Sequence, residues 1–150
     1  VIVLASTMAA LWTKMGKRQP SSQMKFALAA LVAGIAYLAF VPFLSTGTPM
    51  PIVVLMVILV LLTVAELLLS PISLSFATKV APEAFKTQMV SFNFLSLSLG
   101  FTLGGVLGDK LYTAESATSY YIMLAGMGIG SAVVLFVMMP MLKRLLHDVD

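Results

Sequence analysis

Glu66 is the only carboxylate inside the long apolar runs of the sequence, and its side chain is the group there most able to do chemistry. Thr63, Ser70 and Ser73 share its helical spacing, so the four side chains would form one polar stripe on a helix. Because an ionised group at bilayer depth is costly, such a residue is a functional-site hypothesis. Glu66 could exchange a proton, or stay ionised and pair with a cationic group of a substrate. The alternative is a structural buried acid that is neutral or is hydrogen-bonded to Thr63 or Ser70.

Pro71 lies within this polar stripe and predicts a helix kink. Its backbone nitrogen cannot donate a hydrogen bond, so the carbonyl of Leu67 loses its usual partner. Such kinks are tolerated in membranes where neighbouring helices or water satisfy the freed carbonyl.

A second set of polar and small residues shares one face of the run at residues 87–108. Its polar members could line a cavity or hold a neighbouring helix by hydrogen bonds, and the sequence leaves both readings open. Its glycines recur every four residues and predict close packing against another helix. The set comprises Asn93, Ser96, Gly100, Gly104 and Gly108.

Composition places the chain in a membrane. Of its 150 residues, 60% are hydrophobic and only 10% are charged, whereas a soluble domain carries about 25% charged residues. The net charge of +3 lies in loops, so it does not indicate nucleic-acid binding. There is no cysteine, the one histidine is His147 near the C-terminus, and no hydrolase, metalloprotease or phosphate-loop motif occurs. We therefore expect no enzyme, no metal site and no cofactor.

The apolar runs predict an all-α, polytopic membrane protein that forms one transmembrane unit over residues 1–150. Each full run has about 19 or more residues, enough to cross a bilayer. The first run would span only about 17 Å as a helix, so we expect the sequence to begin within a transmembrane helix and to be a fragment. The predicted helices are the half helix 1–12 and the full helices 26–44, 52–77, 87–108 and 119–142.

Two of these helices differ from the others in polarity. The helices at 26–44 and 119–142 carry almost no polar side chains in their middles, so we expect them to face lipid. Ala30 and Gly34 give the first of them a small-residue contact. The two helices with polar stripes should face a protein interior or a water-filled cavity.

The basic residues predict the orientation of the chain. If the loop at residues 13–25 is cytoplasmic, alternation places all of the nine Lys and Arg residues except Lys110 on the cytoplasmic side. This is a strong positive-inside pattern, and it predicts a cytoplasmic C-terminus. It also places Glu66 near the membrane midplane. The residues on that side are Lys14, Lys17, Arg18, Lys25, Lys79, Lys86, Lys143 and Arg144.

The stretch around Glu66 also carries a family resemblance. AELLLSPISLS at residues 65–75, TKVAP at 78–82 and AFKTQMVSFNFLSLSLG at 84–100 together resemble the C-terminal half of the proton-dependent oligopeptide transporters. That family belongs to the major facilitator superfamily, and the likeness is closest to its bacterial di- and tripeptide branch. The resemblance covers essentially the whole chain.

The resemblance implies proton-coupled symport of di- and tripeptides across the cell membrane, with the proton as coupling ion. It implies that Glu66 faces the central cavity and binds the amino terminus of the peptide, next to Ser70 and Pro71. Asn93 stands where the family usually has an aromatic residue, and Asn93 and Ser96 would line the same cavity. The family's N-terminal bundle is absent from this sequence, so the fragment alone should be inactive.

Two other functions remain open. One is a major facilitator carrier for another small solute, with Asn93 reshaping the pocket. The other is a non-transporting membrane subunit that packs through its glycines. A carrier predicts that water reaches Glu66, and a structural subunit predicts that Glu66 is shielded from water.

Overall fold

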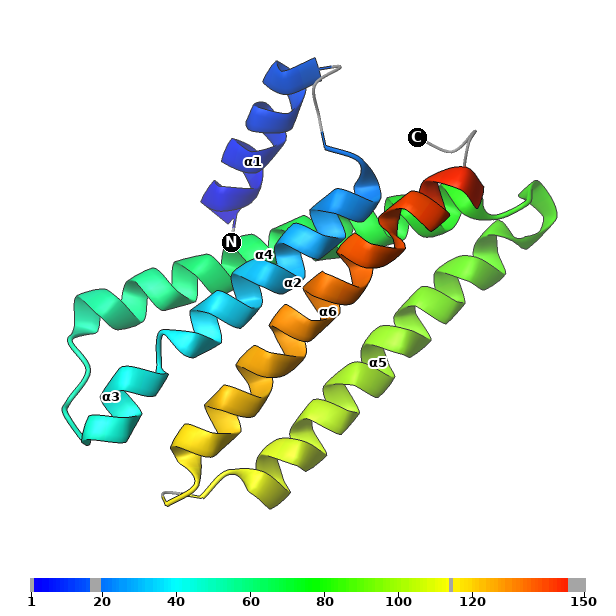
Figure 1. Cartoon of the computed structure of the whole chain (residues 1–150). Coiled ribbons are helices and arrows are strands. Elements are labelled where there is room, and N and C mark those ends of the chain that lie inside the picture. The colour runs from blue at the N-terminus through cyan, green and yellow to red at the C-terminus, as the bar shows by residue number, and fades with distance from the viewer. Residues whose placement is uncertain (1, 17–19, 114, 146–150) are drawn as a thin grey trace.

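The part of the chain that the structure describes is built of helices. The computed structural model describes residues 2–16, 20–113 and 115–145, and within these residues all regular elements are helical. The predicted all-α fold is therefore confirmed (Figure 1). The elements are α1 (Ile2–Met15), α2 (Ser22–Leu38), α3 (Val41–Thr46), α4 (Ile52–Val80), the short 3-10 helix η2 (Glu83–Phe85), α5 (Lys86–Leu111) and α6 (Ala117–Leu145).

Four segments of the described chain are long and apolar enough to cross a membrane. These segments correspond to α2 with α3, to α4, to η2 with α5, and to most of α6. The chain is thus a multi-pass membrane protein. The predicted basic side chains Lys17, Arg18, Lys143 and Arg144, together with His147, lie outside the side chains that the structure describes. The candidate spans, by length and composition, are Ser22–Thr46, Ile52–Val80, Glu83–Leu111 and Ala117–Met141.

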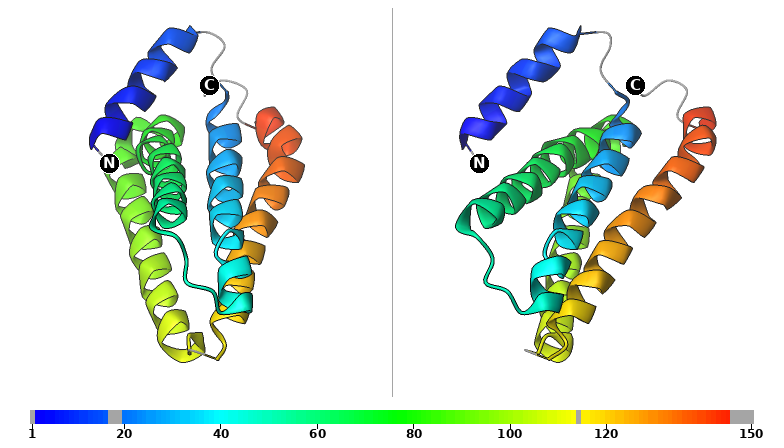
Figure 2. Two further views of the ribbon diagram at one scale, coloured as in Figure 1. Left: turned by 90° about the vertical axis from the view of Figure 1, so that its left-hand side faces the viewer. Right: turned by 60° about the vertical axis from the view of Figure 1, so that its left-hand side comes forward.

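The long helices form two pairs that are joined through α2. Helix α2 packs most extensively against α6 and also along α4, whereas α5 packs against α4 (Figure 1). The left view of Figure 2 shows α2 and α6 on one side and α4 and α5 on the other. Helix α1 touches α4 near its own N-terminal end. Helix α4 therefore contacts both α1 and α5, and a cavity can form where the three helices meet.

Small residues bring α2 and α6 into backbone contact. A Cβ atom built on Gly34 would lie 2.8 Å from Cγ1 and 2.9 Å from the backbone nitrogen of Ile129. A Cβ atom built on Gly128 would lie 2.9 Å from the Cα atom of Gly34 and 3.1 Å from the carbonyl oxygen of Ala30. Ala30 and Gly34 thus make the close helix contact that the sequence indicates.

The expectation that the helix at 26–44 faces lipid is wrong for much of α2. Ala27 and Ala36 are 0% exposed, and α2 belongs to the most buried of the four spans. The physical reason is that a helix without polar side chains suits a helix–helix contact as well as it suits lipid. Its alanines and glycine favour the helix contact, since they let backbones approach. Bulky side chains such as Ile35 remain exposed on another side of α2.

The structure also divides the predicted helix 26–44 into two helices. Helix α2 begins four residues earlier than predicted, at Ser22, where the Oγ atom of Ser21 accepts a hydrogen bond from the backbone nitrogen of Met24 at 3.4 Å. It ends at Leu38, and α3 begins at Val41. Pro42 lies in the first turn of α3 and cannot donate to the carbonyl of Leu38, so the continuous helix is interrupted there.

Helix α5 has no buried residue within the described chain. A Cβ atom added to Gly100 or Gly104 would meet no atom within 4 Å, and one added to Gly108 would lie 3.4 Å from the hydroxyl oxygen of Tyr120. The close contact predicted for the glycine face is therefore not made by described residues at Gly100 and Gly104. Large apolar side chains such as Phe101, which is 78% exposed, also lie open on this helix.

Aromatic side chains gather at the end of the molecule opposite the first turn of α2. The rings of Phe40 and Tyr121 stack with centroids 4.8 Å apart, and Tyr112 meets Tyr120 edge to face at 5.5 Å. Tyrosine is typical of the membrane–water interface. The cluster joins the end of α2 to the start of α6, on either side of the loop that follows α5.

Candidate functional site

Two members of the predicted polar stripe line a cavity of about 420 Å³ between α1, α4 and α5, whereas Ser73 lines the two neighbouring cavities instead. Glu66 and Ser70 line it from α4, and Asn93 lines it from α5. They meet because the loop between Val80 and Lys86 is short, so α5 must return alongside α4. We call this space the Glu66 cavity. Its lining residues are Ala5, Glu66, Leu67, Ser70, Pro71, Leu74, Asn93, Phe94 and Leu97.

Glu66 lies exposed in this cavity and has no hydrogen-bond or ion-pair partner in the described part of the chain. The hydroxyl of Thr63 donates instead to the carbonyl of Leu59 at 2.8 Å. The hydroxyl of Ser73 donates to the carbonyl of Ser70 at 2.9 Å. The alternative of a structural acid bonded to Thr63 or Ser70 therefore has no support in this geometry. The carboxylate is available to a ligand that enters the cavity.

Asn93 lines three neighbouring cavities along the contact of α4 with α5. Besides the Glu66 cavity, it lines one of about 420 Å³ that Gly100 also borders, and one of about 240 Å³ that Phe26 borders. Ser96 lines the latter two but not the Glu66 cavity, and its hydroxyl donates to the carbonyl of Phe92 at 2.9 Å. The predicted site thus divides into Glu66, Ser70 and Asn93 in one cavity and Ser96 in the next.

Pro71 and Leu67 line the Glu66 cavity where Pro71 removes a backbone hydrogen bond. Helix α4 runs from Ile52 to Val80 with Pro71 inside it. The carbonyl of Leu67 has no N–H four residues later, so it lacks its usual partner within the helix. The kink itself stays a prediction.

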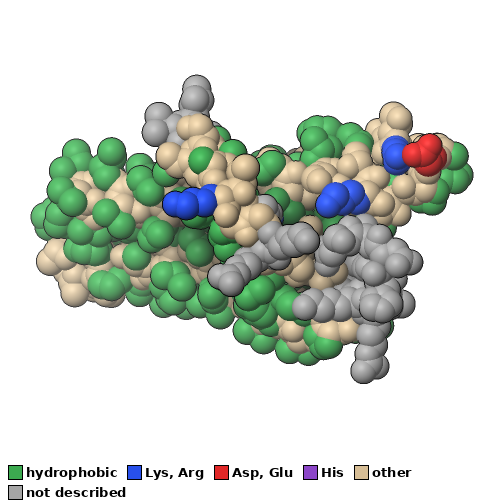
Figure 3. Space-filling view, turned by 90° about the horizontal axis from the view of Figure 1, so that it is seen from above, with side chains coloured by type: hydrophobic (Ala, Val, Ile, Leu, Met, Phe, Trp, Pro, Cys, Tyr) green, Lys and Arg blue, Asp and Glu red, His purple; other side chains and the backbone are tan. Residues whose placement is uncertain are grey.

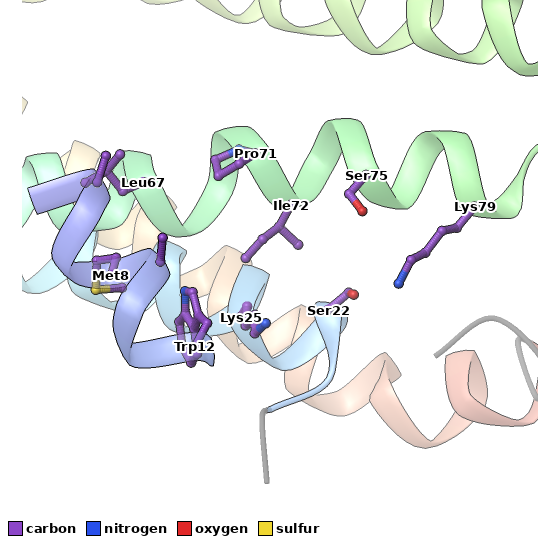
Figure 4. A pocket seen from close by; sticks show the side chains of 11 residues that line it. Met8, Trp12, Ser22, Lys25, Leu67, Pro71, Ile72, Ser75 and Lys79 are labelled. Carbon is purple, nitrogen blue, oxygen red and sulfur yellow. The ribbon is translucent and has the colours of Figure 1, made fainter. Parts of the chain in front are cut away.

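A second cavity, of about 470 Å³, is lined by two lysines that the sequence used only to predict orientation. It lies between α1, α2 and α4 and contains the side chains of Lys25 and Lys79 (Figure 4). The Nζ atom of Lys25 lies 4.4 Å from the ring centroid of Trp12, a cation–π contact. We call this space the basic cavity. The signal in the sequence was a lysine at the start of one apolar run and another at the end of the next.

The polar side chains of the described residues form no large acidic or histidine cluster. Residues 2–16, 20–113 and 115–145 contain no group of three His, Cys, Asp or Glu side chains that could hold an ion. The polar side chains that line the Glu66 cavity carry one carboxylate, one hydroxyl and one amide. Such a set can bind an ammonium group and hydrogen-bond a polar ligand.

Comparisons with known proteins agree on one group of relatives, although no family model matches the chain. The chain is 32% identical over 152 aligned residues to a di-/tripeptide transporter of Lactococcus lactis, an alignment that covers 99% of the chain and 30% of that protein. It is 35% identical over 119 residues to a peptide transporter of Yersinia enterocolitica, which covers 74% of the chain and 23% of that protein.

A solved structure shows the same fold. A crystal structure of a mutant of the peptide transporter POT in complex with alafosfalin superposes with a TM-score of 0.85 and 35% identity, over 96% of the chain and 30% of that protein. The chain therefore spans less than a third of the length of these relatives. This coverage fits the prediction of a C-terminal fragment. The chain belongs to the proton-dependent oligopeptide transporter family of the major facilitator superfamily.

Proposed function

We propose that the chain is part of a proton-coupled symporter of di- and tripeptides, and that the Glu66 cavity belongs to its substrate site. The observation that carries this proposal is the meeting of Glu66, Ser70 and Asn93 around one cavity of about 420 Å³. Ligand pockets of proteins typically measure about 300–1,000 Å³. The names of the relatives, which are peptide transporters, support the same substrate class.

In this mechanism the carboxylate of Glu66 binds the ammonium group at the amino terminus of a peptide. Glu66 has no described partner to release first, so the incoming ammonium does not compete with an internal ion pair. The amide of Asn93 and the hydroxyl of Ser70 then offer hydrogen bonds to the peptide backbone. Ser96, in the neighbouring cavity, would contact a longer peptide or its side chain.

The remaining parts of the mechanism belong to the whole protein. A proton serves as the coupling ion, no other cofactor takes part, and this chain rocks against the N-terminal bundle of the full-length protein during alternating access. The transporter resides in the cell membrane with its C-terminus in the cytoplasm, as the basic loops indicate. The chain alone would not transport.

The test is uptake of a labelled dipeptide into proteoliposomes that contain the full-length protein, with and without an inward proton gradient. We expect gradient-stimulated uptake that unlabelled di- and tripeptides compete. Glu66→Gln should weaken apparent peptide affinity about 10- to 100-fold, since a hydrogen bond to a charged group is worth about 1.5–3 kcal/mol. Glu83→Gln is the matched control, because Glu83 is an exposed loop carboxylate paired with Lys86. Unchanged affinity in Glu66→Gln would exclude this role for Glu66.

The same preparation separates the two other functions. The chain itself has no cysteine, so Glu66→Cys, with any cysteine in the rest of the full-length protein replaced, can report water access through a membrane-impermeant thiol reagent. A carrier for another solute predicts labelling without peptide uptake, and a structural subunit predicts no labelling. The exposure of Glu66 in its cavity favours a carrier over a subunit.

A further inference from the structure

The basic cavity lies at the end of the molecule where four helix termini carry lysine. Lys14 and Lys79 lie in the last turns of α1 and α4, and Lys25 and Lys86 lie in the first turns of α2 and α5. The view onto this end shows basic side chains spread over the surface, with acidic ones beside only one of them (Figure 3). Among the described residues, Glu83 pairs with Lys86 at 2.7 Å. Lys25 and Lys79 instead line the cavity.

Within the cavity, positive charge converges from two helices. Lys79 extends from α4 toward the first turn of α2, where Ser22 and Lys25 lie (Figure 4). Among the described residues that line the cavity there is no Asp or Glu. The first turn of α2 also contains no acidic residue, and a helix N-terminus carries partial positive charge. The polar side of the cavity therefore favours an anion.

The remaining wall of the cavity is apolar. Met8 and Trp12 contribute from α1, and Leu67 and Ile72 contribute from α4. Figure 4 shows these side chains on the part of the cavity away from Lys79. A ligand that fills the whole cavity must therefore carry an anionic group at one end and hydrocarbon at the other.

The lysines also lie at the depth of lipid headgroups. Helix α4 has 29 residues and would be about 43 Å long, which matches the full thickness of a bilayer with its headgroups and exceeds the hydrocarbon core of about 30 Å. Lys79, one residue before its end, then lies in the headgroup layer. Trp12, against which Lys25 rests, is of the residue type enriched at this interface.

We propose that the basic cavity binds the headgroup of an anionic phospholipid, with its phosphate between Lys25 and Lys79 and its hydrocarbon against α1 and α4. Basic pockets between transmembrane helices bind such headgroups in other membrane proteins. This site is separate from the carboxylate of Glu66, although Leu67 and Pro71 border both cavities. A bound lipid would therefore touch α4 beside the predicted kink.

The test is native mass spectrometry of the full-length protein in detergent, titrated separately with phosphatidylglycerol, phosphatidylcholine and inorganic phosphate. We expect tighter binding of phosphatidylglycerol than of phosphatidylcholine. Each lysine near an anionic lipid surface strengthens binding about five-fold. The variant Lys25→Gln/Lys79→Gln should therefore bind phosphatidylglycerol about 25-fold more weakly.

Two further variants keep this test decisive. Lys86→Gln is the matched control, because Lys86 lies at the same end but outside the cavity. Lys25→Arg/Lys79→Arg keeps both charges and should retain preferential binding of phosphatidylglycerol. Equal phosphatidylglycerol affinity in the wild type and in Lys25→Gln/Lys79→Gln would overturn the proposal. Binding of inorganic phosphate as tight as that of phosphatidylglycerol would overturn it too, since the site would then hold a free anion rather than a lipid.

Discussion

Replacing Gly34 by alanine tests the contact between α2 and α6 most directly. The new Cβ atom would lie 2.8 Å from Cγ1 and 2.9 Å from the backbone nitrogen of Ile129, whereas carbon atoms pack best at about 3.5–4.0 Å. The Ile129 side chain can rotate away, but its backbone nitrogen cannot move without α6. The two helices must therefore separate by about 1 Å.

The expected cost follows from two opposing effects. Overpacking of a tight contact costs about 1–3 kcal/mol, and replacing a helical glycine by alanine returns about 0.5–1 kcal/mol. We expect Gly34→Ala to lower the free energy of unfolding by about 1–2 kcal/mol on balance. Gly126→Ala is the matched control, because a Cβ atom there meets nothing within 4 Å. That variant should raise the free energy of unfolding by about 0.5–1 kcal/mol.

The assay is reversible chemical unfolding of the full-length protein in mixed micelles, with both variants measured under one condition. Gly128→Ala should act like Gly34→Ala, since its Cβ atom would lie 2.9 Å from the Cα atom of Gly34. Because both changes push the same helices apart, their effects should not add in the double variant. If Gly34→Ala were as stable as Gly126→Ala, the close backbone contact between α2 and α6 would be refuted.

Three further predictions concern α4 and α5. Asn93→Trp places an indole beside the Glu66 cavity. Because aromatic contacts contribute about 1 kcal/mol, the relative apparent affinities of aromatic and aliphatic dipeptides should change about five-fold in competition uptake. An unchanged ranking would show that Asn93 does not determine substrate choice. Pro71→Ala restores an N–H group for the carbonyl of Leu67, so it should raise the free energy of unfolding by about 1–3 kcal/mol while slowing uptake; faster uptake would argue against a working kink. If another helix packs on the glycine face of α5, Gly100→Leu should lower the free energy of unfolding of the full-length protein by about 1–3 kcal/mol. An unchanged free energy of unfolding would mean that no helix packs on this face.

The positions of polar residues in the sequence carried most of the information about the Glu66 cavity. The spacing of Glu66 and Ser70 places them on one side of α4, and the short loop before α5 brings Asn93 opposite them. The sequence could not separate Ser96 from this set, because one helical turn is enough to move a side chain into the next cavity. The basic cavity was hidden for another reason. Its two lysines come from α2 and α4, and the sequence does not show that these two helices lie side by side.

Helix contacts were harder to predict than cavities. A uniformly apolar run gives no sign of which side meets lipid, so the buried position of α2 was missed although Ala30 and Gly34 marked its contact with α6. The break before α3 was also missed. Pro42 lies near the end of the run, where it could have ended the helix or begun a new one, and the sequence pattern does not distinguish these outcomes.

Two sets of glycines in this chain show what decides whether a helix surface is packed against another helix. Gly34 and Gly128 meet each other across α2 and α6, and both have partners within 3.1 Å of an added Cβ atom. Gly100 and Gly104 lie four residues apart, as Ala30 and Gly34 do, yet no described atom lies within 4 Å of a Cβ atom added to either glycine. Spacing alone therefore marks a surface that a helix can approach, and only the fold shows whether one does. Since the chain spans less than a third of its relatives, a helix packed on the glycine face of α5 would have to come from outside the residues described.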